Sequence, residues 1–240
     1  MQTPSPQKML RVWEEGQSCP PWARALLLLE AAAPGTDRAV LTRLPVGERD
    51  ARLVELRAGL FGETLSSLAE CPACGERLEL TFSIADLRLP APTASAPYRF
   101  QRGAVAACFR LPDSADFEAL PVGPQAPRVL LEACVSDVTC DGAPAALGDL
   151  TEADIAALVA QMAETDPRAD LKAAMTCPHC RHAWSARFDI VGFLWEELGA
   201  WVRRLLAEVH VLARSYGWHE DDVLALSPWR RRYYIGLVRS

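Results

Sequence analysis

Two Cys-x-x-Cys segments are the residues of this sequence best suited to chemistry. They are Cys71-Pro-Ala-Cys74 and Cys177-Pro-His-Cys180. A segment of this kind supplies two thiolate ligands, so a tetrahedral zinc site with four sulfur ligands requires both of them. We therefore expect one structural Zn²⁺, held by Cys71, Cys74, Cys177 and Cys180. Such a site is closed, because it has no open coordination position at which a water or a substrate could be activated.

An alternating apolar pattern follows each cysteine segment at the same offset. The two patterns are Leu78, Leu80, Phe82, Ile84 and Trp184, Ala186, Phe188, Ile190. A period of two places every second side chain on one face, which predicts two half-buried strands. The matched offsets favour the two halves of a zinc ribbon. The expected fold class is therefore α+β, with a central four-Cys zinc ribbon of short antiparallel strands between N-terminal and C-terminal helical segments. We expect three regions: 1–64 (helical), 65–190 (zinc ribbon, α+β) and 191–240 (helical).

Two other interpretations of the cysteines stay open. A thiol-disulfide oxidoreductase needs the first cysteine at a helix N-terminus, where the dipole lowers the thiol pKa, whereas a strand-like pattern follows Cys180. The segments could also be two unrelated pairs of buried thiols. The remaining cysteines have no ligand-like spacing, and we expect small, buried or half-buried apolar side chains at Cys19, Cys108, Cys134 and Cys140.

Composition and charge are those of an ordinary globular protein. Half of the residues are hydrophobic, and the formal net charge is −6, which weighs against a general nucleic-acid-binding role. The N-terminus lacks the form of a signal peptide, and the longest apolar run, Ala25 to Ala33, is too short to span a membrane. We therefore expect a cytoplasmic, reducing location and no membrane association, which favours a metal over disulfides. The sequence shows no nucleophile–base pair, glycine-rich phosphate loop or paired-carboxylate motif, so we expect neither catalysis nor a small-molecule substrate.

Helical periodicity occupies both ends of the chain. After a polar and loosely ordered start at 1–19, we expect helices at 22–33, 36–44 and 46–60, a hairpin at 98–111, and a helix at 151–164 that turns Ile155, Leu158, Val159 and Met162 inward. A stripe with steps of three or four residues then predicts one long amphipathic helix that ends at Gly217. Its members are Leu194, Leu198, Trp201, Leu205, Val209, Leu212 and Tyr216. Because a stripe of this length is stable only when it packs, we expect burial of Leu198, Trp201, Leu205, Leu212 and Tyr216. Two shorter helices follow, at 220–226 and 229–238.

The last of these helices carries aromatic and basic residues. Trp, Tyr and Arg are the residues that most often anchor protein interfaces. We therefore expect a partner-binding face formed by Trp229, Arg230, Arg231 and Tyr233. The same segment leaves a DNA-binding regulator with a structural zinc site as an alternative, although the acidic chain does not favour it.

A series of short motifs runs from about residue 40 to the end. In order they are Val46-Gly-Glu-Arg-Asp50, Phe61-Gly62, Cys71 to Gly75, Arg110-Leu-Pro112, Met162 to Pro167, Phe193-Leu-Trp195, Glu208 to Trp218 and Leu226-Ser-Pro228 with an arginine pair. This order resembles baseplate and baseplate-hub assembly proteins of contractile-tailed phages and of phage-tail-like contractile injection systems. The resemblance implies a protein without catalytic activity that helps to assemble a baseplate or forms part of it, with baseplate or hub proteins as partners. Retention in the finished tail particle stays open.

Overall fold

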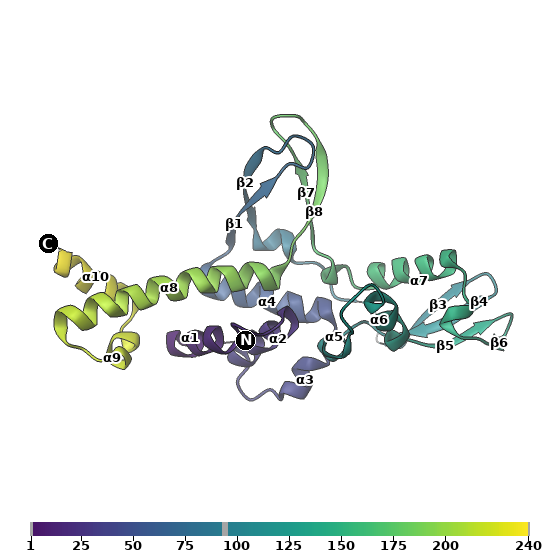
Figure 1. Ribbon diagram of the computed structural model, residues 1–240, viewed down its shortest axis with the longest axis horizontal. Coiled ribbons are helices and arrows are strands. Elements are labelled where there is room, and N and C mark those ends of the chain that lie inside the picture. Colours follow the sequence, from purple (N-terminus) through teal and green to yellow (C-terminus); the bar gives the residue numbers. More distant parts are fainter. Residues whose placement is uncertain (1, 93–95, 240) are drawn as a thin grey trace. The chain divides into compact units, whose positions relative to one another are not determined.

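The computed structural model describes residues 2–92 and 96–239 (Figure 1). The chain forms two compact units. One comprises Gly35–Ile190, and the other joins the residues up to Pro34 with those from Val191 onward. The division of the chain into the regions 1–64, 65–190 and 191–240 stays a prediction. No helix in the described part of the chain combines the length and the hydrophobicity that a bilayer-spanning segment requires.

The described residues of the unit Gly35–Ile190 form helices and three antiparallel sheets. One sheet pairs β1 (Thr64–Glu70) with β2 (Arg77–Ser83), and another pairs β7 (Lys172–Thr176) with β8 (Ala183–Arg187). The third has the order β3 (Tyr98–Arg102), β4 (Val105–Phe109), β5 (Val135–Cys140), β6 (Ala143–Pro144). The helices are α3 (Arg38–Thr42), α4 (Val46–Phe61), α5 (Ser114–Ala119), α6 (Ala126–Cys134) and α7 (Glu152–Thr165), with 3₁₀ turns η1 (Ile84–Leu87), η2 (Leu147–Asp149) and η3 (Pro167–Ala169). The expected α+β class is confirmed.

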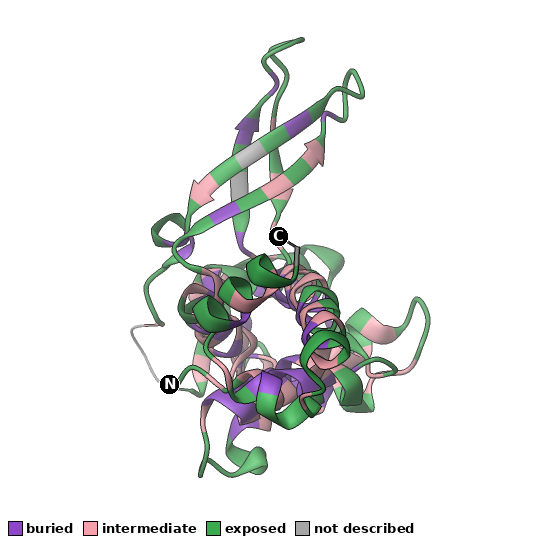
Figure 2. Ribbon diagram, turned by 90° about the vertical axis from the view of Figure 1, so that its left-hand side faces the viewer, coloured by how far each residue is buried: buried purple, intermediate pink, exposed green. Residues whose placement is uncertain are grey.

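Each cysteine segment lies in the turn of a β-hairpin. The register pairs Glu70 with Arg77 around the first turn and Thr176 with Ala183 around the second. The strands expected after the cysteines are thus present as β2 and β8, but both are shorter than predicted. Ile84 belongs to η1, β8 ends at Arg187 before Phe188, and Ile190 is the first residue of α8. The side chain of Leu80 lies outside the described part of the structure. The strands that precede the cysteines, β1 and β7, escaped prediction. Figure 2 shows that both hairpins are largely exposed, with buried residues only at intervals.

The four-stranded sheet has a small core of its own. The expected hairpin is formed by β3 and β4, and α7 packs against it. The buried core residues are Phe100, Val105, Ala107, Phe109, Leu111, Leu150 and Leu158. The N-cap of α7 is Thr151, whose side chain accepts from the backbone N–H of Asp154. Leu158 is fully buried as expected, and Ile155 and Met162 are half-buried. Val159 is exposed instead, so its predicted inward orientation is wrong.

The other unit is helical. It contains α1 (Pro6–Glu15), α2 (Pro21–Ala32), nearly all of α8 (Ile190–Tyr216), α9 (Glu220–Ala225) and α10 (Pro228–Arg239). The start of the chain is not loose, because Ser5 caps α1, which buries Met9, Leu10 and Val12. The ring of Trp195 on α8 lies so close to Gly16 that a Cβ there would come within 2.1 Å of it, and the Arg24 guanidinium lies 4.8 Å from the centre of the same ring.

Most of the apolar stripe on α8 is buried. Leu194, Leu198, Leu205, Val209 and Leu212 are buried, in agreement with the periodicity, whereas Trp201 is only half-buried. Tyr216 is exposed, with its ring stacked on that of Trp218 at 4.7 Å, so burial of Tyr216 was a wrong expectation. The helix ends where Gly217 adopts a φ of 70° and donates its N–H to the carbonyl of Ala213.

Candidate metal centre and partner surface

The turns of the two hairpins bring the four predicted cysteines together. The sulfur atoms of Cys71, Cys74, Cys177 and Cys180 all lie within 4.8 Å of one another. The Sγ–Sγ distance is 3.6 Å between Cys71 and Cys180 and 3.7 Å between Cys74 and Cys177. In a tetrahedral site with metal–sulfur bonds of about 2.3 Å, neighbouring sulfurs are about 3.8 Å apart. The cluster can therefore hold a metal ion with little rearrangement.

The two turns are built by the same backbone hydrogen bonds. In the first, the N–H of Cys71 donates to the carbonyl of Glu76, and the N–H of Gly75 donates back to Cys71, both at 2.9 Å. In the second, the N–H of Cys177 donates to His182 and that of Arg181 to Cys177, again at 2.9 Å. Gly75 and Arg181 both have positive φ values, 73° and 61°. The second turn therefore imposes on an arginine a conformation that a glycine adopts at lower cost.

Apolar contacts hold the hairpins together near the cysteines and beyond them. Cys71 and Cys177 are buried and cluster with Leu78, and Trp184 packs against this cluster. Phe82 and Phe188 meet edge to face with their ring centres 5.4 Å apart. Two-stranded hairpins are marginal by themselves, so these contacts and a shared metal would have to stabilise them jointly.

The thiols of the cluster have unequal acidities. Burial raises the pKa of Cys71, but hydrogen bonds from the N–H groups of Ala73 and Cys74, together with those from the thiols of Cys74 and Cys180, lower that pKa to about 7. At Cys74 the N–H of Glu76 lowers the pKa, yet burial and the neighbouring sulfurs Cys180, Cys71 and Cys177 raise it to about 12. One thiolate at the cluster thus opposes the ionisation of the next. A bound cation removes this repulsion and allows all four thiolates to act as ligands.

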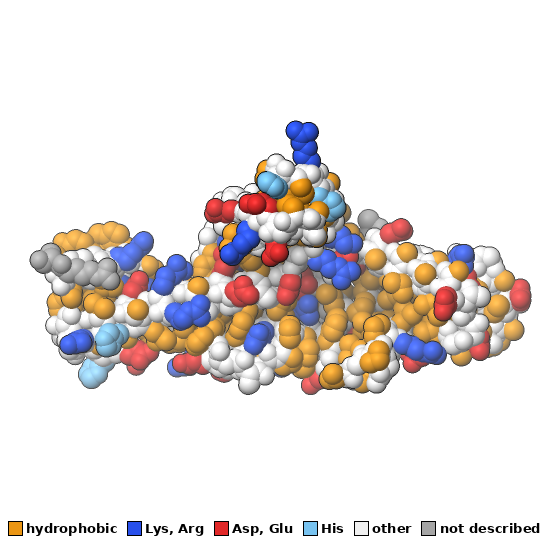
Figure 3. Space-filling view, turned by 45° about the horizontal axis from the view of Figure 1, so that its top comes forward, with side chains coloured by type: hydrophobic (Ala, Val, Ile, Leu, Met, Phe, Trp, Pro, Cys, Tyr) orange, Lys and Arg blue, Asp and Glu red, His pale blue; other side chains and the backbone are white. Residues whose placement is uncertain are grey.

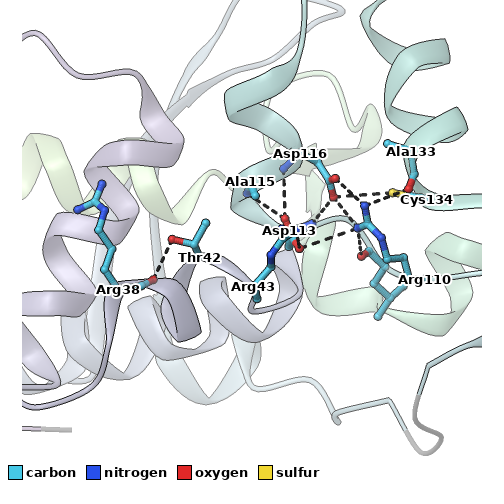
Figure 4. A network of polar contacts seen from close by, with 10 residues as sticks. Arg38, Thr42, Arg43, Arg110, Asp113, Ala115, Asp116, Ala133 and Cys134 are labelled. Atoms are coloured by element: carbon cyan, nitrogen blue, oxygen red, sulfur yellow. Dashed lines mark hydrogen bonds and ion pairs between the residues drawn. The ribbon is translucent and has the colours of Figure 1, made fainter.

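The other cysteines lie apart from this cluster, and Cys134 belongs to a polar network (Figure 4). Arg110 donates to both carboxylate oxygens of Asp116 at 2.7 Å, while Arg43 lies 3.2 Å from Asp113. The Cys134 sulfur is 3.9 Å from Asp116, and burial raises the pKa of Cys134 to about 11, so this thiol stays protonated. Cys19 and Cys108 are half-buried as expected, whereas Cys140 is exposed.

Three of the short motifs meet at the N-terminus of α4. The N–H of Val46 donates to the carbonyl of Pro112 at 2.9 Å, and the N–H of Gly47 donates to the carboxylate of Asp166 at 3.0 Å. Arg168 pairs with Glu48 at 3.0 Å. We call this contact region, formed by residues 46–50, 110–112 and 166–168, the α4 junction. The sequence analysis identified these three motifs but did not predict that they lie close together, because Gly47 and Asp166 are 119 positions apart in the chain.

The C-terminal segment retains part of the expected partner surface. Trp229 and Tyr233 are exposed with their rings stacked at 5.5 Å, and Arg230 is exposed beside them. The structure corrects the expectation for Arg231, which is only 2% exposed. Its guanidinium donates to Glu208 of α8 at 2.8 Å and to the carbonyl of Leu226 at 2.6 Å. Arg231 therefore anchors α10 and is absent from the outer face.

Charges of both signs are interspersed on the face of the molecule that Figure 3 shows. Hydrophobic side chains lie between the acidic and basic ones in this view (Figure 3). A duplex-binding surface usually concentrates Lys and Arg on one face or along one helix. With Arg231 buried, the C-terminal segment also has fewer accessible arginines than the sequence suggested. Neither observation favours the DNA-binding alternative.

Fold and site define an α+β protein with a four-cysteine centre at the turns of two hairpins. The family model described as T4 bacteriophage base plate protein matches residues 27–195, well over half of the chain, so the chain belongs to this family. This finding confirms the resemblance to baseplate proteins. Comparison with curated proteins and with solved structures gave no match.

Proposed function

We propose that this chain is a non-enzymatic structural or assembly subunit of the baseplate of a contractile phage tail or of a phage-tail-like injection system. It acts through protein–protein contacts, and a structural zinc ion stabilises its fold. Membership of the base plate family is the observation that carries the proposal. The four-thiol cluster agrees with a structural role, because a Cys₄ site that is filled by protein ligands has no position for a reacting water.

Zn²⁺ is the proposed occupant of the site formed by Cys71, Cys74, Cys177 and Cys180. Thiolate ligands in a tetrahedral arrangement are typical of zinc, and the sulfur separations agree with zinc–sulfur bonds of about 2.3 Å. The ion would join two hairpins that are separated by roughly a hundred residues of chain. In the chain-entropy model, a cross-link of this span stabilises the folded state by about 4–5 kcal/mol.

The proposed partners are baseplate or hub proteins, and the contact surface is the outer face of α10. Trp229, Arg230 and Tyr233 are exposed together on this helix. Exposed aromatic side chains beside an arginine have the composition of an interface hot spot. We propose that the protein assembles with its partners in the cytoplasm and remains in the tail particle.

A deletion strain tests the function directly. Tail particles are counted by electron microscopy after complementation with the wild-type chain, with Cys71→Ser or with Arg230→Glu. We expect no normal baseplates from the deletion, full recovery with the wild type, and failure with either variant. Normal particles from the deletion strain would refute the baseplate role, and normal particles from Arg230→Glu would exclude the α10 face as the contact.

A further inference from the structure

The second turn, between β7 and β8, carries an exposed arginine without an ion-pair partner. It presents three basic side chains to solvent, those of His179, Arg181 and His182. Within the part of the chain that the structure describes, the Arg181 guanidinium pairs with no carboxylate. Arg187, at the other end of β8, is instead paired with Asp170 at 3.2 Å. The charge of Arg181 is therefore left available to a partner.

The backbone of Arg181 has a conformation that arginine rarely adopts. Its φ is 61°, and the matching position of the first turn is occupied by Gly75, with a φ of 73°. Among the other described residues, the non-glycine positions with positive φ are Asp137 and Asp141, and aspartate tolerates this region better than most residues. An arginine there lowers stability relative to glycine. Such outliers concentrate at sites that bind a ligand or a partner.

We infer that Arg181 is a contact residue for a carboxylate of another baseplate protein. The inference rests on the proposed function, to which it adds a second contact surface besides the face of α10. A guanidinium without a partner suits a carboxylate, with which it can form two parallel hydrogen bonds. The backbone hydrogen bonds from Cys177 to His182 and from Arg181 to Cys177 fix the turn and so hold the side chain at the surface.

The neighbouring first turn favours an acidic protein segment over nucleic acid or a lipid surface. Glu70 and Glu76 flank the cysteines of this turn and are both exposed. The cysteine cluster brings the two turns together, so these carboxylates lie on the same end of the paired hairpins as Arg181. Nucleic acids and anionic membranes are bound by clusters of Lys and Arg, which this mixed surface lacks among its described residues.

Three substitutions at one position separate the strain from the charge. Arg181→Gly removes both, Arg181→Lys keeps both, and Arg181→Glu keeps the strain and reverses the charge. In the purified full-length protein, Arg181→Gly should raise the melting temperature by about 2–4 °C, and the other two should leave it unchanged. Metal content should equal that of the wild type in all three. A lower melting temperature for Arg181→Gly would remove the strain on which the inference stands.

Complementation of the deletion strain measures the function of the same variants. We expect loss of normal particles with Arg181→Gly and Arg181→Glu, although both variants are folded, and recovery with Arg181→Lys. Arg99→Glu, at an exposed arginine of β3, is the matched control and should complement like the wild type. Normal particles with Arg181→Gly, from a deletion strain that lacks them, would overturn the inference and leave the proposed function intact.

Photocrosslinking identifies the partner and does not depend on the phenotype of the deletion. Benzoylphenylalanine, a photoreactive amino acid, replaces His179, because Ala73 at the matching position shows that the turn requires no particular side chain there. We expect a cross-linked peptide of a tail protein that contains Asp or Glu, and reversal of that carboxylate to Lys should restore particles with Arg181→Glu. A cross-link to nucleic acid or lipid, a peptide without a carboxylate, or the absence of a cross-link would each contradict the inference.

Discussion

Gly47→Ala should destabilise the protein although glycine is normally the poorer helix former. Gly47 is the second residue of α4, and a Cβ built on it would lie 2.1 Å from Oδ1 and 2.3 Å from Oδ2 of Asp166. The Asp166 side chain is buried, so it cannot swing into solvent. The methyl group must therefore displace the carboxylate that accepts the N–H of Gly47 and lies 3.6 Å from Arg168.

The magnitude follows from three contributions. Overpacking of a buried site costs about 1–3 kcal/mol, and the loss of a hydrogen bond to a charged group costs about 1.5–3 kcal/mol. The greater helix propensity of alanine returns up to about 1 kcal/mol. The expected net loss is therefore about 1.5–6 kcal/mol in the free energy of unfolding, or roughly 3–24 °C in melting temperature for a chain of this length.

Denaturant and thermal unfolding, followed by circular dichroism, provide the measurement. Gly236→Ala is the matched control, because Gly236 also lies in a helix and a Cβ there meets no atom within 4 Å. This control should leave stability unchanged or raise it slightly. In an Asp166→Ala background, Gly47→Ala should lose most of its cost, since the clashing carboxylate is gone. Equal stability of Gly47→Ala and the wild type would refute the reasoning.

Three further predictions concern the metal, the core and pH. The purified protein should contain one Zn²⁺ per chain by elemental analysis; Cys71→Ser should lose it and Cys134→Ser should keep it, and substoichiometric zinc in fresh wild type would contradict the site. Leu205→Ala should cost about 2–5 kcal/mol in urea unfolding, because Leu205 is buried, and an unchanged midpoint would mean that the stripe of α8 does not pack as described. Hydrogen bonds from Arg110 hold the pKa of Asp116 below its usual 3.8, so this pair stabilises the fold above that pH and the stabilisation is lost as pH falls through the lower folded-state pKa. Urea unfolding between about pH 7 and pH 3 should show a flatter acid dependence for Asp116→Asn, and an identical dependence would exclude the pair as a cause.

The sequence predicted those features that depend only on residues close together in the chain. Ligand spacing identified the four cysteines, and the period of two identified β2 and β8, because neither depends on distant residues. The stripe of α8 was found for the same reason. The four cysteines of the candidate metal centre could thus be identified from the sequence, whereas the distances between them required the structure.

Features that depend on distant partners escaped prediction. Arg231 is charged and lies in a basic run, yet Glu208 on another helix allows it to be buried. The polar first residues form α1 because Met9, Leu10 and Val12 find a core to pack into. The junction between Gly47 and Asp166 has no local signal, because a glycine near a helix start is unremarkable until the carboxylate beside it is known.

The cysteine cluster and the α4 junction each hold together the two ends of the same long loop in the middle of the chain. Each joins residues before position 75 to residues after position 165, so residues 76–165 form a loop whose ends are held together at two places. Lengthening such a loop changes the free energy of folding little, since each doubling of the length of a closed loop costs only about 0.6 kcal/mol. The four-stranded sheet can therefore accept insertions at its turns without disturbing the cysteine cluster. If the proposed zinc ion were removed, the two hairpins would keep only their apolar contacts, while the α4 junction would still join Gly47 to Asp166.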